Sequence, residues 1–269
     1  MRIPPHLRER FLKEAIKNGM KVLTYDIETS HMLVRTFYIG QKVSLHHHQV
    51  KVPSKVITIQ YKWAHEKRAQ YLEWNKVDTK YDDGRSFDDS SMIEEFATNV
   101  LSQADLVITQ NGDKFDFAVL NERAKALKLS LLDQKPSIDI LKLSRKSFRA
   151  ASHKLDYRSH QQGLGGKIKM IDEDWVDIEE KGVPVSKKMA PYGLKDTTDT
   201  ERLTWKELPY YKDLPVTVEK VILSFLTNSS LTKKEDKPFC PVCAKIKKPK
   251  FNVEVKKGKI HCLNCGEIS

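Results

Sequence analysis

The sequence predicts a mixed α/β domain followed by a small zinc-binding domain. Three strand-like segments come early and in succession, helical patterns and one further short strand follow them, and all four cysteines gather near the C-terminus. The chain has 269 residues, of which 39% are hydrophobic and 31% charged. This composition provides enough apolar material for one large domain and a small one, and too much for a disordered chain.

The predicted strands alternate apolar and polar residues or form short apolar runs. Segments 21–29, 56–63 and 70–74 follow one another as an antiparallel meander, and segment 105–109 is a short buried strand. Helical patterns cover residues 5–17, 91–101, 115–127, 138–148, 155–161, 191–208 and 217–226. Residues at the ends of these segments are typical of helix termini. Asn18-Gly19 favours a helix C-terminus, Ser91 an N-cap and Pro191 a first helical turn.

The chain divides at a polar, charged segment without periodicity, residues 227–237, which we interpret as a linker. Residues 1–226 form the predicted main domain, and residues 238–269 the predicted zinc ribbon. Cys240, Cys243, Cys262 and Cys265 form two C-x2-C pairs separated by eighteen residues, a spacing typical of one structural zinc ion. Disulfide bonds are the alternative, but they would require an oxidising compartment. A redox-active C-x2-C pair is less favoured, because the chain has two matched pairs.

The charge of the chain favours a polyanionic partner. The formal net charge is +11, and residues 231–269 contribute more than half of it with ten lysines against four acids. Nucleic acid is the commonest partner of such a chain, because cations that neutralise phosphates release condensed counterions. A lysine-rich solvated surface is the alternative interpretation. No apolar stretch is long enough to cross a membrane and no secretory leader is visible, so we expect a cytoplasmic protein, in a cell or in the host of a virus.

Two carboxylates stand at alternate positions on the first predicted strand. Asp26 and Glu28 share one face of that strand, while Tyr25 and Ile27 take the other. Converging carboxylates repel one another unless a cation lies between them, and Mg²⁺ or Mn²⁺ prefers such oxygen ligands. A solvated strand face would show the same pattern.

Two further segments carry acids at places where α/β proteins gather functional groups. Asn111-Gly112 follows the strand at 105–109, and the pair Phe115-Asp116 opens the next helix. Asp116 could instead cap that helix, and Asp113 competes for the same role.

In the helix that begins near Pro191, Tyr192 and Asp196 lie one turn apart on one face. A solvated first turn is the simpler alternative, and Asp199 is a reserve candidate three residues further on.

Taken together and in this order, the three segments resemble the motifs of the DEDD, or DnaQ-like, superfamily of 3′-to-5′ exonucleases. Asp26 and Glu28 match its D-x-E motif, Asn111, Phe115 and Asp116 match its second motif, and Tyr192 with Asp196 matches the Tyr-x3-Asp motif of its tyrosine subfamily. The resemblance covers residues 20–210 and excludes the predicted zinc ribbon. It implies a ribonuclease H-like mixed sheet, antiparallel in its first three strands and then parallel, flanked by helices.

The resemblance also implies two-metal hydrolysis of phosphodiester bonds. Asp26, Glu28 and Asp196 would hold one Mg²⁺ or Mn²⁺ ion that activates water, and Asp26 with Asp116 would hold a second ion that stabilises the leaving 3′-oxygen. Tyr192 would orient the water by a hydrogen bond.

Three classes of function follow from the resemblance and the charge. The first is a 3′-to-5′ exonuclease on DNA in replication, repair or degradation, the second is the same chemistry on RNA, and the third is a nucleic-acid-binding scaffold on an inactive nuclease fold. The zinc ribbon is expected to bind nucleic acid or to dock a replication or repair protein.

Other residues are open to both functional and structural interpretations. Lys154, Arg158 and Lys167 lie near a glycine-rich turn at 163–166, which could approach phosphates or simply end a helix, and the second is preferred. Phe115 is expected in the core. The run 46–48 of three histidines is expected to be a loop or exposed strand and not a metal site.

Overall fold

The centre of the protein is a mixed five-stranded sheet. The computed structural model describes residues 2–37, 44–76, 87–166, 168–231, 253–256, 259–262 and 266–268. The strands of the sheet are β1 (Val22–Thr29), β4 (Val56–Trp63), β5 (Gln70–Glu73), β8 (Leu106–Thr109) and β9 (Ser137–Asp139). Their order is β5-β4-β1-β8-β9, with β5, β4 and β1 antiparallel and β1, β8 and β9 parallel. The predicted mixed sheet is therefore confirmed.

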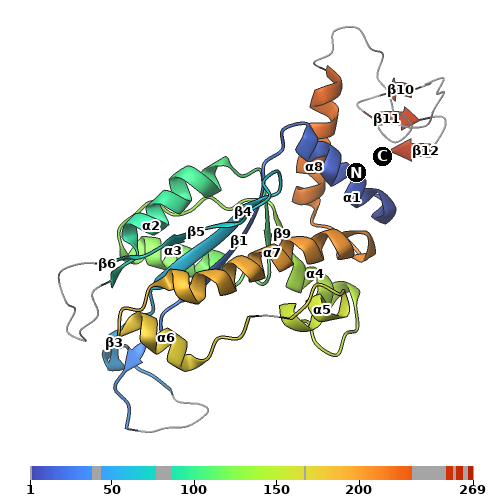
Figure 1. The fold of residues 1–269 in the computed structure, drawn as a ribbon. Helices are drawn as coiled ribbons and strands as arrows, with labels where there is room; N and C mark the ends of the chain where they lie inside the picture. Colours follow the sequence, from blue (N-terminus) through green and yellow to red (C-terminus); the bar gives the residue numbers. More distant parts are fainter. Residues whose placement is uncertain are drawn as a thin grey trace.

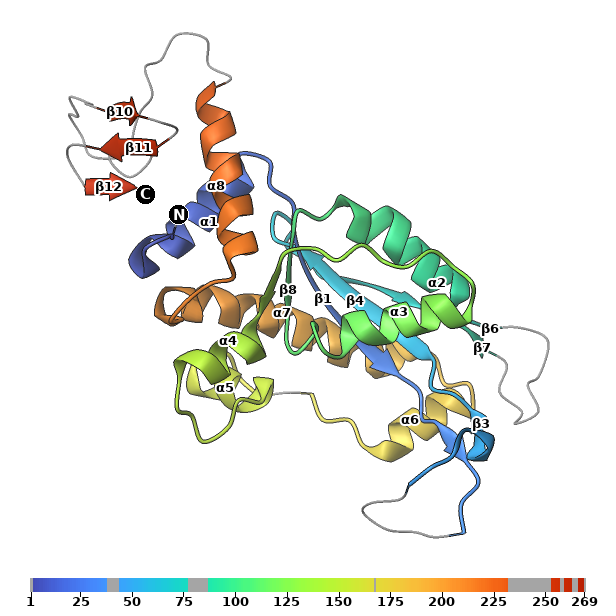
Figure 2. The same cartoon turned by 180° about the vertical axis from the view of Figure 1, so that it is seen from behind.

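Helices flank this sheet on both faces (Figures 1 and 2). They are α1 (Arg8–Lys17), α2 (Ser90–Glu95), α3 (Asp116–Ala126), α4 (Ile140–Ser147), α5 (Leu155–Gln161), α6 (Asp172–Glu179), α7 (Met189–Glu207) and α8 (Val216–Leu231). A π-helical turn (Phe96–Val100) and a 3-10 turn (Leu101–Gln103) extend α2, and further 3-10 turns are Pro5–Leu7, His47–Gln49, Val185–Lys187 and Leu208–Tyr210. The predicted α/β class, with a sheet between helices, is confirmed.

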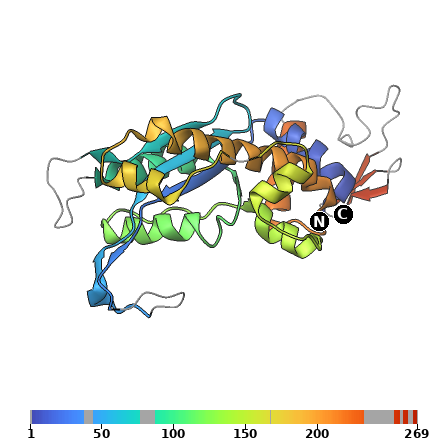
Figure 3. The same ribbon diagram turned by 60° about the horizontal axis from the view of Figure 1, so that its bottom comes forward.

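The sheet lies between α7 on one side and α3 on the other (Figure 3). Strand β1 alternates between two hydrophobic clusters, because Leu23, Tyr25 and Ile27 belong to one cluster and Val22 to the other. The first cluster includes α2 and α3, and the second joins β8 and β9 to α1, α4 and α8. Burial on both sides fixes the register of β1.

Short strands lie outside the central sheet. They pair as β2 (Leu33–Val34) with β3 (Val50–Val52), β6 (Asn75–Lys76) with β7 (Phe87–Asp88), and β10 (Val253–Lys256), β11 (Lys259–Cys262) and β12 (Gly266–Ile268) as one antiparallel sheet. Cys262 ends β11, whereas Cys240, Cys243 and Cys265 lie outside the described residues. The zinc ribbon and the domain boundaries stay predictions.

Several element boundaries differ from the prediction. The segment 138–148 was expected to be one helix, but its first residues form β9 beside β8, and Asp139 then caps α4 through the backbone N–H groups of Leu141 and Lys142. The apolar run that β9 shares with α4 hides this change of period. Helix α8 continues to Leu231, five residues into the expected linker. Helix α6 was not predicted because its five acids obscure its apolar face.

The histidine run 46–48 is exposed in and beside a 3-10 turn, as the loop prediction required. Among the described residues, no helix is long and apolar enough to cross a membrane.

Candidate active site

Side chains from four distant segments line one pocket of about 390 Å³. All five predicted catalytic residues are among them. The lining residues are Asp26, Ile27, Glu28, Gln110, Phe115, Asp116, Lys154, Leu155, Asp156, Tyr192 and Asp196. The structure thus brings together the predicted carboxylates of β1, α3 and α7.

Strand β1 presents its two acids on the face that α7 covers. Tyr25 and Ile27 are buried in a hydrophobic cluster, and the pleat turns Asp26 and Glu28 to the opposite face. Gln60 of β4 is the register partner of Asp26 and meets α7. Both acids are half-buried, so they remain accessible from the pocket.

Helix α7 approaches the sheet at a glycine. A Cβ added to Gly193 would stand 2.3 Å from the side chain of Gln60, so a larger residue fits only if the Gln60 side chain, the helix or the strand moves. The neighbouring Tyr192 meets Trp175 of α6 edge to face, with 6.2 Å between ring centroids, and Trp175 donates from Nε1 to the Thr29 carbonyl. Asp196 is 4% exposed. These contacts place Tyr192 and Asp196 beside the end of β1.

A buried ion pair further along α7 secures the same approach. Lys62 of β4 and Glu201 of α7 lie 2.7 Å apart, and each side chain is 8% exposed. Removal of either partner would lower the stability of the fold strongly, because the other charge would stay buried without a partner.

Asp116 links the second motif to the first. Its Oδ1 accepts a hydrogen bond of 3.0 Å from the backbone N–H of Ile27, between the two acids of β1. Burial raises the pKa of Asp116 to about 7, although backbone N–H groups and the Asp26 side chain act in the opposite direction. Within the described part of the chain, Asp116 forms no ion pair with a cationic side chain.

The turn before α3 requires a left-handed backbone conformation at residue 111 and a glycine at residue 112. Asn111 has a φ of 73°, and a Cβ on Gly112 would lie 2.4 Å from Thr109. The strand, the turn and the helix therefore meet closely, and this places Phe115 and Asp116 at the end of the sheet.

Three other acids near the motifs, Asp113, Asp139 and Asp199, do not line the pocket. Asp113 is 3.7 Å from Lys142 and does not line the pocket. Asp199 is buried beside Lys195, at 2.5 Å, and does not line the pocket. Asp139 accepts hydrogen bonds from the backbone of Asn111 and of α4, so its role is structural.

Sequence reasoning missed some of the pocket. Gln110 and Asp156 line it, and neither belongs to a motif, although Gln110 directly follows β8. Lys154 also lines it, as the phosphate interpretation allowed. Phe115 is 44% exposed, so the expectation that it fills the core is wrong, because the first turn of α3 points toward the pocket.

Arg158 is 4% exposed and bonded to Glu207, which supports its structural interpretation, and Lys167 lies outside the described residues.

The donors in the pocket fit a hard divalent cation. The four predicted ligands are carboxylates, and among the described residues no thiol or imidazole lines the pocket. As placed, no three His, Cys, Asp or Glu side chains of the described ranges form a metal-ligating cluster. The donor chemistry nevertheless fits a site that a cation completes, since Asp116 is buried and burial raises its pKa.

A larger hollow, of about 560 Å³, lies between α1 and Trp205 and contains none of the predicted acids. Its lining mixes basic, acidic and apolar side chains from His6 to Lys17. Size alone therefore does not identify the site.

Comparisons with known proteins point to DNA polymerases of archaea. The chain is 32% identical over 114 residues to a DNA polymerase of Thermococcus sp. (strain GE8), and 31% identical over 114 residues to one of Thermococcus gorgonarius. Each match covers 42% of this chain but only 6% and 12% of those polymerases. No family model matches the chain.

Among solved structures, the family B DNA polymerase of Pyrobaculum calidifontis aligns with 83% of this chain and 31% of its own, at 15% identity and a TM-score of 0.45.

Proposed function

We propose that the chain is a metal-dependent 3′-to-5′ exonuclease with a ribonuclease H-like fold, of the DnaQ-like superfamily and its tyrosine subfamily. One observation carries the proposal: the five predicted catalytic side chains, from three segments far apart in sequence, line the same pocket at the end of β1. The mixed strand order of the sheet agrees with the fold that the motifs imply.

Asp26, Glu28, Asp116 and Asp196 are the proposed ligands of two Mg²⁺ or Mn²⁺ ions. Their four negative charges balance two divalent cations, and oxygen ligands suit these metals. When bound, such ions activate water and stabilise the leaving 3′-oxygen of a phosphodiester.

The remaining pocket residues position the substrate. The Tyr192 hydroxyl orients the attacking water by a hydrogen bond, and the ring stays in place against Trp175. Exposed Phe115 offers a face to the terminal base, and Lys154 offers a cation to a backbone phosphate.

DNA is the favoured substrate, because the curated relatives are DNA polymerases. The same chemistry on RNA 3′ ends is the alternative, since discrimination depends on contacts to the 2′-hydroxyl. A role as an inactive binding scaffold is less consistent with a pocket that retains every motif acid.

The four cysteines are proposed to bind one structural Zn²⁺, and the basic C-terminal segment to bind nucleic acid or a replication or repair protein. Elemental analysis of the purified full chain should find one zinc per molecule. Absence of zinc from protein purified without chelators would remove this proposal.

The exonuclease proposal is tested with 5′-labelled single-stranded DNA and RNA of the same sequence, in Mg²⁺, in Mn²⁺ and in EDTA. We expect a ladder that shortens from the 3′ end with metal only, faster on DNA, and absent in the Asp26→Ala and Asp196→Asn variants. Tyr192→Phe should slow hydrolysis by a smaller factor. Full activity of both acid variants would contradict the proposal.

A further inference from the structure

A second hollow, of about 410 Å³, lies beside the pocket on the other side of α5. Leu155 and Asp156 line the pocket, whereas the next two residues, Tyr157 and Arg158, line this α4–α5 hollow. Its complete lining is Ser144, Phe148, Ala150, Tyr157, Arg158, Gln161, Gln162, Glu207 and Tyr210. One short helix therefore forms the wall between the two.

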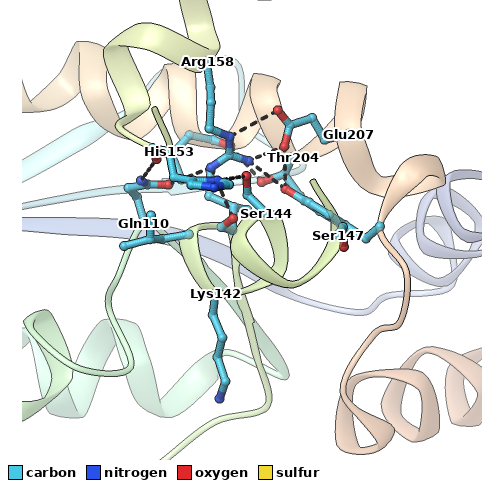
Figure 4. A network of polar contacts seen from close by, with 12 residues as sticks. Gln110, Lys142, Ser144, Ser147, His153, Arg158, Thr204 and Glu207 are labelled. Carbon is cyan, nitrogen blue, oxygen red and sulfur yellow. Dashed lines mark hydrogen bonds and ion pairs between the residues drawn. The ribbon is translucent and has the colours of Figure 1, made fainter. Parts of the chain in front are cut away.

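The floor of the α4–α5 hollow is a closed polar network (Figure 4). Arg158 donates to both carboxylate oxygens of Glu207, to the Ile140 carbonyl at 3.2 Å and to the Tyr211 hydroxyl at 3.1 Å. Tyr211 in turn donates to Glu207 at 2.9 Å. Since these buried charges neutralise each other, the floor is fixed and does not require a charged ligand.

Aromatic rings line the rim of the hollow. Tyr210 is 73% exposed and Tyr157 is 37% exposed, a large area of ring left to solvent. The segment that carries Tyr210 is held against α4, because the Lys212 N–H donates to Ser147 Oγ at 2.8 Å and Lys146 lies 3.0 Å from Asp213. The backbone that carries Tyr210 is therefore fixed against α4.

Basic residues are neighbours in sequence of the residues that line the hollow and the pocket. Residues 140–158 contain six basic residues and one acid, and Arg145, Arg149 and Lys154 are exposed. Within the described ranges, neither Arg145 nor Arg149 forms an ion pair. Lys142 of α4 points away from the polar network in Figure 4, and its Nζ lies 3.7 Å from Asp113.

The opposite side of the pocket has the opposite charge. Helix α6, whose Trp175 contacts Tyr192, belongs to a segment, 172–180, with six acids and no basic residue. Lys188 and Lys181 pair with Asp174 and Asp177, and His31 lies 3.1 Å from Glu179, so the segment keeps a net negative charge. A polyanion that leaves the pocket is therefore attracted toward α4 and α5 and repelled from α6.

We propose that the α4–α5 hollow binds a nucleobase of the single-stranded substrate, a few nucleotides 5′ of the scissile bond. The base stacks on Tyr210 and Tyr157, and Arg145, Arg149 and Lys154 contact the phosphates on the way to the pocket. Exposed rings beside unpaired cations are the combination that single-stranded nucleic acid requires. The inference rests on the proposed function for its direction along the strand.

The test compares a 12-nucleotide and a 3-nucleotide single-stranded DNA on the full-length chain. Binding is measured in EDTA by fluorescence anisotropy of the labelled 12-mer, with the unlabelled trimer as competitor, so that hydrolysis is not needed. Tyr210→Ala should weaken 12-mer binding about fivefold or more and leave trimer binding unchanged. Phe37→Ala, which removes a 97% exposed ring on another segment, should change neither.

A second variant tests the phosphate contacts. Arg149→Ala should lower the dependence of 12-mer affinity on salt by about one counterion. Lys125→Ala, an exposed cation on α3, should leave that dependence unchanged.

The outcomes separate the two proposals. Wild-type 12-mer affinity in Tyr210→Ala overturns the base site even if both DNAs are hydrolysed with Mn²⁺. Loss of 12-mer binding in Tyr210→Ala supports the site even if neither DNA is hydrolysed, and the exonuclease proposal alone then fails. An equal loss of affinity for the trimer and the 12-mer in Tyr210→Ala also overturns the base site, because the trimer is too short to extend from the pocket into the hollow.

Discussion

Two buried aspartates, Asp89 and Asp116, show how the same residue type serves stability in one place and a site in another. Asp89 is 0% exposed and receives hydrogen bonds of 2.8 and 2.6 Å from Arg123, together with the Val56 N–H. Asp116 is 2% exposed, accepts a bond from the Ile27 N–H, and burial raises its pKa to about 7. Arg123 of the fold neutralises Asp89, whereas we propose that a cation from solution neutralises Asp116.

The largest expected effect separates activity from stability at Asp116. Asp116→Asn keeps the acceptor for the Ile27 N–H but removes the charge, so hydrolysis of single-stranded DNA in Mn²⁺ should fall by about a thousandfold or more. In EDTA, the free energy of unfolding should stay the same or increase, because an unfavourable buried charge is lost. Urea unfolding and initial rates measure the two quantities. An active variant would remove Asp116 from the site.

The reverse result is expected at Asp89. Asp89→Asn leaves Arg123, 11% exposed, without its charged partner, and should lower the free energy of unfolding by about 3 to 5 kcal/mol. At a temperature where the variant is folded, its rate of hydrolysis should stay close to that of the wild type. A variant that unfolds in urea like the wild type would show that Arg123 does not stabilise the buried charge.

A smaller effect tests how α7 brings its residues to the pocket. Gly193→Ala places a Cβ 2.3 Å from Gln60 and should cost about 1 to 3 kcal/mol of stability and lower the rate, because Tyr192 and Asp196 move with the helix. Gly166→Ala, where no atom lies within 4 Å, serves as control and should change stability by less than about 0.5 kcal/mol. Equal effects of the two substitutions would contradict the close approach.

Much of this arrangement could be predicted from local sequence. Alternation in β1 placed Asp26 and Glu28 on one face, and the turn residues Asn111 and Gly112 marked the end of β8. Strand β9 and helix α6 were missed because apolar and acidic runs do not carry a clear period.

Other features depend on tertiary contacts that no local pattern contains. Gln110 and Asp156 reach the pocket because α5 packs beside the end of β8, and Arg158 donates to Gln110 at 3.3 Å. The exposure of Phe115 follows from the direction of the first turn of α3, which the sequence leaves open. The spacing of the motif acids predicts which residues meet, but not which neighbours complete the pocket.

We propose that a divalent metal ion from solution neutralises Asp116, in the way that the Arg123 side chain neutralises Asp89. Titration of Mn²⁺ into the wild type, Asp116→Asn and Asp113→Asn, followed by electron paramagnetic resonance of the free ion, tests it most directly. Asp113 is the matched control, since it lies three residues away, outside the pocket and beside Lys142. We expect Mn²⁺ to bind to the wild type and to Asp113→Asn, and to bind at least about tenfold more weakly to Asp116→Asn. Equal Mn²⁺ affinity in all three proteins would contradict it.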